Sequence, residues 1–389
     1  MTIKQLSIAA LSILLITSCS KDDDAPTPTT STNGGGGGNP TYQIPSTYVF
    51  LDGSNQSTVN FDGQKQRLEM LSEMVVYMKT GNTVGTTLSA SQLKAMYANN
   101  AYTWADAPGL GMTGSTKQLK DKTAAGDIGV QAMFENYMDS IAVHSSLNFS
   151  NSTETYGQAG VWTNGTKSYL MSGTGFEYGQ IIEKGLMCAV FMNQMTVNYL
   201  GTLADDDNTT PLAGKTYTEM QHHWDEAFGY FTSEIDYPTN GTDRFWGKYA
   251  QGSNETLLST GTNIMNAFLK GRAAIDNNDY ATRDAQITII RDQIEKVCAG
   301  TAIHYLNEAK ANITNPTIKN HVLSEAIAFI DGLRYGYNSI NGVSITSAEI
   351  DMALGYIGND FNSVTITNLN LAIDLIASKT GLNDVKAAL

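Results

Sequence analysis

The segment richest in chemistry-bearing residues spans 219–230 and holds two of the chain's five histidines. His222 lies four positions before Glu226, and His223 lies three positions before it. Glu219 lies four positions before His223, and such spacings bring side chains together on one side of a helix. Imidazole and carboxylate groups suit zinc, iron or manganese. The pattern predicts a metal site at Glu219, His222, His223 and Glu226, with iron or zinc as the ion.

The geometry of this helix leaves a second interpretation open. At about 100° per residue, the polar side chains of Glu219, His222 and Glu226 lie nearly opposite the apolar stripe. They form either a solvated face or the lining of a second, wetter interface. One helix supplies too few ligands by itself. His321 and Glu325, spaced i,i+4 in a later helix, could complete a site or could be satisfied at the edge of the core.

Other catalytic patterns are missing from the sequence. It contains no His-Glu-x-x-His, Gly-x-Ser-x-Gly, P-loop or Cys-x-x-Cys motif. A metal-dependent hydrolase, with Glu226 as general base beside a metal on His223, is therefore the weakest of three functional hypotheses. For a glycan-binding surface, Trp104, Trp162 and Trp246 fall in loop-like sequence, where their rings could form an exposed platform.

Helical periodicity dominates the elements that must position these residues. Two β-prone runs, 47–51 and 57–61, predict a small hairpin ahead of the helices. Loops are expected at 103–117 and 145–175. We predict a mainly α fold, a multi-helix bundle with a small N-terminal β-hairpin. The expected helices lie near 68–78, 89–96 and 133–141, and at 177–200, 216–231, 259–276, 281–311, 316–337, 346–357 and 366–379.

The segment 177–200 is apolar on nearly all sides, which predicts a central, buried helix. It is too short and too often interrupted by polar residues to span a membrane. Cys188 lies in this segment and Cys298 in a later helix. A disulfide between them and two buried free thiols both remain open from the sequence.

The N-terminus carries an export signal. Lys4, an apolar run over 6–16 and small residues before Cys19 follow the order of a secretory signal. Residues 15–19 resemble the lipobox of bacterial lipoproteins, which implies removal of residues 1–18 and lipidation of Cys19. We expect a Gly-, Pro- and Thr-rich tether at 19–45, followed by a single helical domain at 46–389.

The charge of the chain limits its partners. The formal net charge is −14 at pH 7. Binding to nucleic acid and electrostatic docking on anionic lipid are therefore disfavoured. Residues 20–24, Ser-Lys-Asp-Asp-Asp, resemble the surface-export signal of Bacteroidetes lipoproteins. We expect a protein held at the outer membrane by lipidated Cys19, facing outward, with the periplasmic face as the alternative.

Several segments resemble one family. Tyr48-Val49-Phe50 and the stretches 63–68, 183–187 and 223–231 look like a Bacteroidetes lipoprotein family catalogued as domain of unknown function 4856. The 223–231 segment also resembles imelysin-like proteins, whose Gly-x-His-x-x-Glu motif matches at His223 and Glu226 but has Gln221 in place of Gly. That second resemblance implies a helical, exported protein linked to iron uptake.

These observations favour a non-enzymatic binding lipoprotein that assists capture of iron or haem at the outer membrane. A TonB-dependent transporter or an imelysin-like protein is the expected partner. The alternative is a glycan-binding surface lipoprotein that serves a TonB-dependent transporter.

Overall fold

The computed structural model describes residues 41–105, 107, 109–147, 154–239 and 242–389. The chain divides into two units, of which the second covers residues 40–389. Every described residue belongs to the second unit, which we call the body. The predicted signal at 1–18, Cys19 and most of the tether at 19–45 lie outside the described residues.

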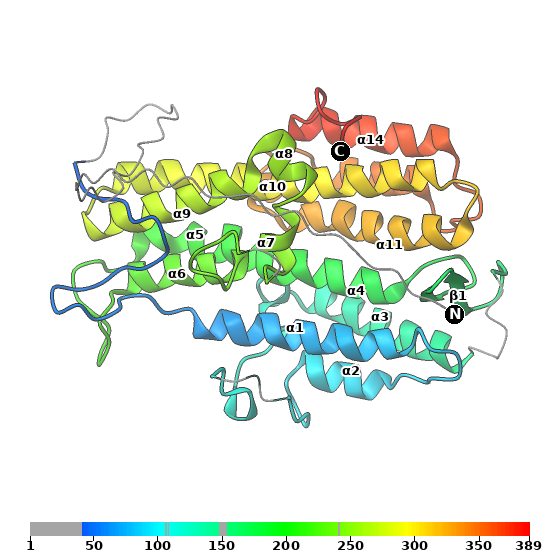
Figure 1. Ribbon diagram of the computed structural model, residues 1–389, viewed down its shortest axis with the longest axis horizontal. Coiled ribbons are helices and arrows are strands. Elements are labelled where there is room, and N and C mark those ends of the chain that lie inside the picture. Colours follow the sequence, from blue (N-terminus) through cyan, green and yellow to red (C-terminus); the bar gives the residue numbers. More distant parts are fainter. Residues whose placement is uncertain (1–40, 106, 108, 148–153, 240–241) are drawn as a thin grey trace, which may run out of the picture. The chain divides into compact units, whose positions relative to one another are not determined.

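The body is a helical bundle, as predicted. The long helix α10 packs against α9, α11 and α14, and α11 in turn packs against α4. Figure 1 shows α1 and α2 on the opposite side of α4 and α6 from α10 and α14. The longer helices are α1 Asp62–Thr80, α2 Ala90–Tyr97, α3 Ile128–Ser146, α4 Tyr178–Leu186, α6 Glu219–Phe231, α9 Thr260–Asp276, α10 Tyr280–Ala311, α11 Pro316–Gly332, α13 Ser347–Ile357 and α14 Ile366–Thr380.

Short helical turns join these elements. Two of them, α7 and α8, lie where the sequence predicted no helix. The short α-helices are α5 Leu200–Thr202, α7 Phe245–Tyr249, α8 Ser253–Leu258 and α12 Tyr337–Ile340. The 3-10 turns are η1 Met112–Gly114, η2 Lys120–Gly126, η5 Leu203–Asp205 and η6 Leu333–Tyr335.

Capping residues fix where the helices begin. The hydroxyl of Ser89 accepts a hydrogen bond from the backbone N–H of Gln92 at the start of α2. Thr218 and Gln221 form a reciprocal capping box at the start of α6. Each bond satisfies a backbone donor that has no partner within the helix. The predicted start of α2 at Ser89 is accurate to one residue, whereas the predicted start of α6 at residue 216 is three residues too early.

The predicted central helix is buried but is not a regular α-helix. After α4 the chain continues through two π-helical segments, η3 Met187–Met192 and η4 Gln194–Tyr199. All six residues of η3 are buried. The wider π turns place the amide of Asn193 against the carbonyl of Tyr335, with a 3.0 Å hydrogen bond. Such segments occur often at functional sites.

The predicted N-terminal hairpin is only partly formed. The chain reverses over 52–56, but a single bridge between Leu51 and Ser57 replaces the expected strands. Tyr48 explains the difference, because its backbone N–H bonds to the carbonyl of Ile235 and its ring stacks on Phe228 at 3.6 Å. Tyr48 therefore contacts the rest of the body instead of pairing with a second strand of a hairpin.

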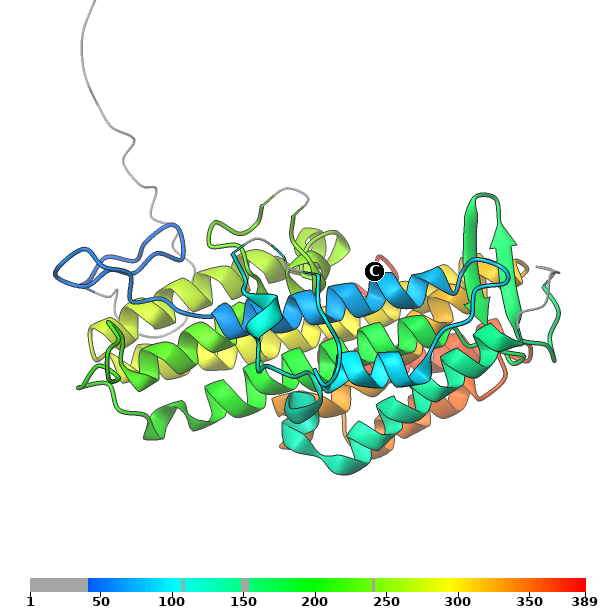
Figure 2. The ribbon, with the colours of Figure 1, turned by 90° about the horizontal axis from the view of Figure 1, so that it is seen from below.

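The described sheet lies where the sequence predicted a loop. Strand β1, Gly160–Asn164, pairs antiparallel with β2, Lys167–Met171. Trp162 faces Tyr169 across the pair. The expectation of a loop over 145–175 was wrong here, because the β-prone residues on either side of Asn164-Gly165 form a hairpin signal that was overlooked. Figure 2 shows this hairpin at the opposite end of the body from residues 41–61.

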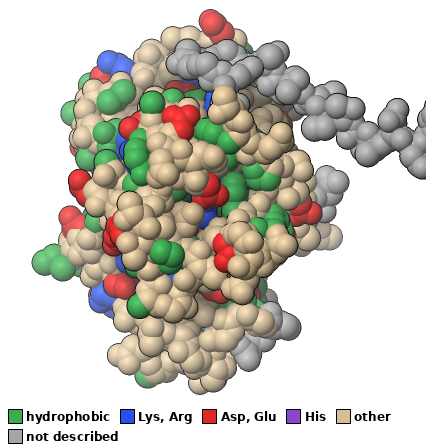
Figure 3. Space-filling view, turned by 90° about the vertical axis from the view of Figure 1, so that its left-hand side faces the viewer, with side chains coloured by type: hydrophobic (Ala, Val, Ile, Leu, Met, Phe, Trp, Pro, Cys, Tyr) green, Lys and Arg blue, Asp and Glu red, His purple; other side chains and the backbone are tan. Residues whose placement is uncertain are grey.

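The sequence left open whether Cys188 and Cys298 form a disulfide. Cys188 and Cys298 are both buried free thiols. Among the described residues, no helix is long and apolar enough to cross a membrane. The end of the body seen in Figure 3 carries acidic side chains that are spread over the face and do not gather in one patch.

Candidate functional site

Helix α6 presents the predicted metal ligands, and each of them has a neighbour. His223 Nδ1 lies 2.8 Å from Asp206 Oδ2. Glu219 Oε2 accepts a long hydrogen bond of 3.4 Å from the backbone N–H of Asp207. Both contacts tie α6 to the loop that precedes it. The Nε2 atom of His223 remains available, as in a histidine whose other nitrogen is fixed by a carboxylate.

His222 faces the other way, towards residues that lead into α1. Its Nδ1 lies 3.1 Å from the backbone carbonyl of Asn60, and its Nε2 lies 3.9 Å from Glu226 Oε1. Glu226 Oε1 also accepts a 2.9 Å hydrogen bond from Gln64 Nε2. Burial lowers the pKa of His222, although the charge of Glu226 opposes that effect. The polar face of α6 is thus the lining of a second interface, one of the two alternatives from the sequence.

The strongest polar contact of α6 comes from a residue that the sequence analysis did not select. Asp225 is fully buried and accepts hydrogen bonds from Tyr48 Oη at 2.8 Å and from the backbone N–H of Asn60 at 3.2 Å. Its Oδ1 lies 3.0 Å from Nε of Arg272, which is also fully buried. Arg272 bonds in addition to Asp276. Asp225 therefore fastens both α9 and the segment 48–60 to α6.

Burial raises the pKa of Asp225 to about 6, even though Arg272 and the hydrogen bonds from Tyr48 and Asn60 favour the charged form. Loss of hydration outweighs these partners because the carboxyl group lies in the interior. The carboxyl group binds the segment to the body at a cost in hydration, which is typical of a structural ion pair.

The predicted metal site stays a prediction. Over the described ranges, no group of three or more His, Cys, Asp and Glu side chains is arranged to hold a metal ion. His222 and Glu226 approach one another, whereas His223 pairs with Asp206 and Glu219 contacts the loop. In the structure, these four side chains connect α6 to the loop before it and to the start of α1.

The second predicted pair lies in a different part of the bundle. His321 Nδ1 is 2.6 Å from Glu177 Oε2, and His321 Nε2 is 3.7 Å from Glu325 Oε2. The ring stacks on Tyr169 of strand β2 at 4.1 Å. Burial alone would lower the pKa of His321, but the hydrogen bond and charge of Glu177 and the charge of Glu325 outweigh it, so the pKa is raised.

Lys184, in the last turn of α4, continues this ionic network. Its ammonium group lies 2.7 Å from Glu183 Oε1 and 3.5 Å from Glu325 Oε1, and the residue is 5% exposed. Burial would lower the pKa of Lys184, but Glu183 and Glu325 outweigh it and raise the pKa. The lysine therefore stays charged inside the bundle.

A cleft of about 210 Å³ opens above Lys184, between α1, α4 and α7. Three cations line it, Lys184, Arg244 and Lys248, with one carboxylate, Glu183. Its remaining lining residues are Ser72, Val75, Phe245 and Tyr249.

Two of these cations stand at the accessible side of the cleft. Arg244 Nη1 bonds to Glu69 Oε2 at 2.6 Å and to Ser72 Oγ at 3.1 Å. Lys248 is exposed, and its ammonium group forms no ion pair with any residue of the described ranges. Arg244 is paired with Glu69, and Lys184 with Glu183 and Glu325, so Lys248 is the cation of this lining that has no carboxylate partner among the described residues. A free ammonium group at the accessible side of the cleft can attract an anionic group.

The aromatic platform expected of a glycan site is not formed. The indoles of Trp104, Trp162 and Trp246 are 4%, 1% and 0% exposed. Trp246 lies in α7 and donates a hydrogen bond to the carbonyl of Met187. The prediction that these rings lie exposed in loops was wrong, because each ring fills a gap in the packing of the body.

Comparison with known proteins identifies the family. A family model described as domain of unknown function (DUF4856) matches residues 45–382. The chain belongs to the DUF4856 family. No curated protein and no solved structure matches it. The resemblance to the DUF4856 family is therefore confirmed, whereas its Bacteroidetes and imelysin-like parts stay predictions.

The match in this DUF4856 chain covers both the α6 motif and the cleft. The metal ligands predicted from the sequence lie on α6 and α11 and do not include Lys184, Arg244 or Lys248. A signal for Lys184 was present, since it is a charged residue that directly precedes the apolar run at 185–192. Arg244 and Lys248 are spaced i,i+4, but nothing local relates them to α1 or α4.

Proposed function

We propose that this DUF4856 chain is a lipid-anchored protein of the bacterial envelope whose body binds a small anionic solute in the cleft between α1, α4 and α7. The observation that carries this proposal is the lining of that cleft by Lys184, Arg244 and Lys248. Cations on low-dielectric walls concentrate the opposite charge. The guanidinium of Arg244 can also bind a carboxylate through two parallel hydrogen bonds.

Binding without chemical conversion suits this lining better than catalysis. Ser72, the aliphatic hydroxyl in the lining, donates to the carbonyl of Leu68 and accepts from Arg244. A nucleophilic hydroxyl requires an adjacent general base, and a guanidinium cannot serve as one. The lining thus supplies charge for recognition and no activated nucleophile at Ser72.

The proposed solute and its route rest on the expected lipidation of Cys19 and on the cations that line the cleft. Lipidated Cys19 would hold the body at the outer membrane, facing outward, where a TonB-dependent transporter takes the solute over. Iron would enter this scheme as an anionic complex with an organic acid, since the cleft is lined by cations. An acidic sugar has the same charge and is the second class to test.

A titration of the purified protein tests the binding step. Small carboxylates, phosphate and sugar acids are added to the wild type and to an Arg244→Gln, Lys248→Gln double variant. We expect at least one acid to bind the wild type and to lose about tenfold or more in affinity in the double variant. Lys215→Gln, which removes an exposed lysine outside the cleft, is the matched control. Binding that is unchanged in the double variant would contradict the proposal.

The anchor is tested separately. Cys19→Ser should move the protein from the membrane fraction to the soluble fraction and should abolish incorporation of labelled fatty acid. Continued acylation of the variant would show that the anchor lies elsewhere.

A further inference from the structure

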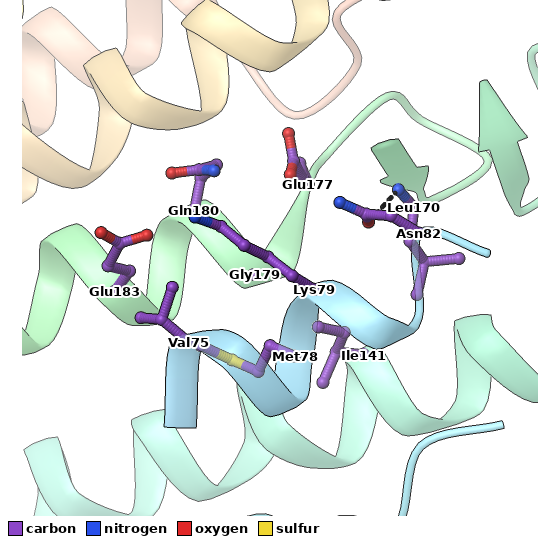
Figure 4. A pocket seen from close by; sticks show the side chains of 10 residues that line it. All are labelled: Val75, Met78, Lys79, Asn82, Ile141, Leu170, Glu177, Gly179, Gln180 and Glu183. Atoms are coloured by element: carbon purple, nitrogen blue, oxygen red, sulfur yellow. Dashed lines mark hydrogen bonds between the residues drawn. The ribbon is translucent and has the colours of Figure 1, made fainter. Parts of the chain in front are cut away.

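A second, smaller cavity adjoins the cleft. It measures about 10 Å³, and both Val75 and Glu183 line the two spaces. The cavity and the cleft are therefore neighbours along the groove between α1 and α4. Glu177, Gln180 and Glu183 line it from one face of α4, at intervals of three residues (Figure 4). Its volume corresponds to about one water-sized group.

One of the side chains that line this small cavity, Gln180, has an atom without a partner. Gln180 is 7% exposed, and its Oε1 has no hydrogen-bond partner among the described residues. A buried carbonyl oxygen without a donor is unfavourable, so such atoms usually face a ligand or a water. Glu177 and Glu183 already accept from His321 and Lys184. The cavity thus presents acceptors, and the free one is an amide oxygen.

An ammonium group of the chain itself approaches this cavity. Figure 4 shows Lys79 extended along the groove in the direction of Gln180. Lys79 is exposed, and its ammonium group forms no ion pair within the described ranges. The side chain can therefore withdraw into solvent when another amine enters.

We infer that the small cavity and the cleft together form one site for a zwitterion, an amino acid or short peptide. Its ammonium group would donate to Gln180 Oε1 in the small cavity, and its carboxylate would lie at Arg244 and Lys248 in the cleft. Glu183, which lines both spaces, favours the cationic end of the ligand. This inference rests on the proposed function, since the carboxylate uses the same cleft.

A matched series of ligands tests the inference. The ω-amino acids from glycine to 6-aminohexanoate are titrated beside the carboxylic acids that lack the amine. We expect one chain length at which the amino acid binds about tenfold more tightly than its acid, because a charged donor then reaches the unpartnered oxygen. Gln180→Leu should abolish that preference and leave the affinity for the plain acid unchanged. Lys79→Ala should increase the preference, since it removes the competing ammonium group.

The outcomes separate the two claims. If the plain acids bind but no amino acid is preferred, the inference fails and the proposed function stands. If neither series binds, the proposed function fails and the inference fails with it. A preference that survives Gln180→Leu, in a variant whose melting temperature matches the wild type, would show that the amine is recognised elsewhere and would overturn the inference.

Discussion

Replacement of Asp225 by Ala should destabilise the body severely, although the residue lies outside both cavities. The substitution removes the acceptor of Tyr48 Oη and of the Asn60 backbone N–H. It also leaves the guanidinium of Arg272, which is fully buried, with Asp276 as its remaining carboxylate partner. Tyr48 and Arg272 lose their bonds in the buried interior, whereas Asn60 is partly buried.

The magnitude follows from that geometry. Breaking a buried ion pair from one side costs about 3–5 kcal/mol, because the other charge stays buried. Asp276 reduces this penalty, because it still pairs with Arg272. The donors of Tyr48 and Asn60, left without their acceptor, add about 1–3 kcal/mol each, and these contributions are not strictly additive. We expect a loss of about 4 kcal/mol, a large share of the 5–15 kcal/mol that is usual for a folded domain.

Urea unfolding followed by circular dichroism measures this loss in the purified protein. Asp374→Ala is the matched control, because Asp374 forms a comparable ion pair with Lys386 at the surface and is 61% exposed in its side chain. We expect a change of less than about 1 kcal/mol for that control. A loss below about 1 kcal/mol for Asp225→Ala would refute the reasoning, since the buried network would then contribute no more than a surface pair.

Three further predictions follow from buried contacts. Because the pKa of His321 is raised in the folded state, its charged form stabilises the fold fully at low pH, and this contribution is lost as the pH rises above about 6.5. His321→Gln should therefore flatten the dependence of melting temperature on pH in that range. Gly271→Ala should lower the stability by about 3 kcal/mol or more, because a Cβ there would overlap the ring of Trp224, whereas Gly355→Ala, with open space around it, should not. The two cysteines of the body are buried thiols, so a thiol reagent should label neither before unfolding, and prompt labelling would contradict the packing.

The helices could be predicted from the sequence because their signals are local. The stripe that ends before Gly81, the cap at Ser89 and Pro316 at the start of α11 each act within a few residues. The predicted ranges 259–276, 281–311 and 366–379 therefore lie within one residue of α9, α10 and α14 at each end. The turn residues Asn164-Gly165 are an equally local signal for the hairpin β1–β2, but they lie in a polar stretch that resembles a loop.

The site could not be predicted in the same way, because distant segments assemble it. Tyr48 meets Asp225 across 177 positions, and Arg244 meets Glu69 across 175. Residues 47–61 have the composition of strands, yet they form a single bridge and Tyr48 stacks on Phe228 of α6. The histidines on α6 could be selected because their spacing to Glu226 is local, whereas the cations of the cleft come from separate segments and form no sequence motif.

The most direct test of the proposed function compares two variants at the mouth of the cleft. Arg244 is held by Glu69 at 2.6 Å. Glu69→Gln removes the competing carboxylate and should tighten the binding of a small carboxylate, whereas Arg244→Gln should weaken it. Isothermal titration with the acid that binds best measures both variants. Shifts of opposite sign are the predicted result, and equal affinities in the wild type and both variants would contradict an anion site in this cleft.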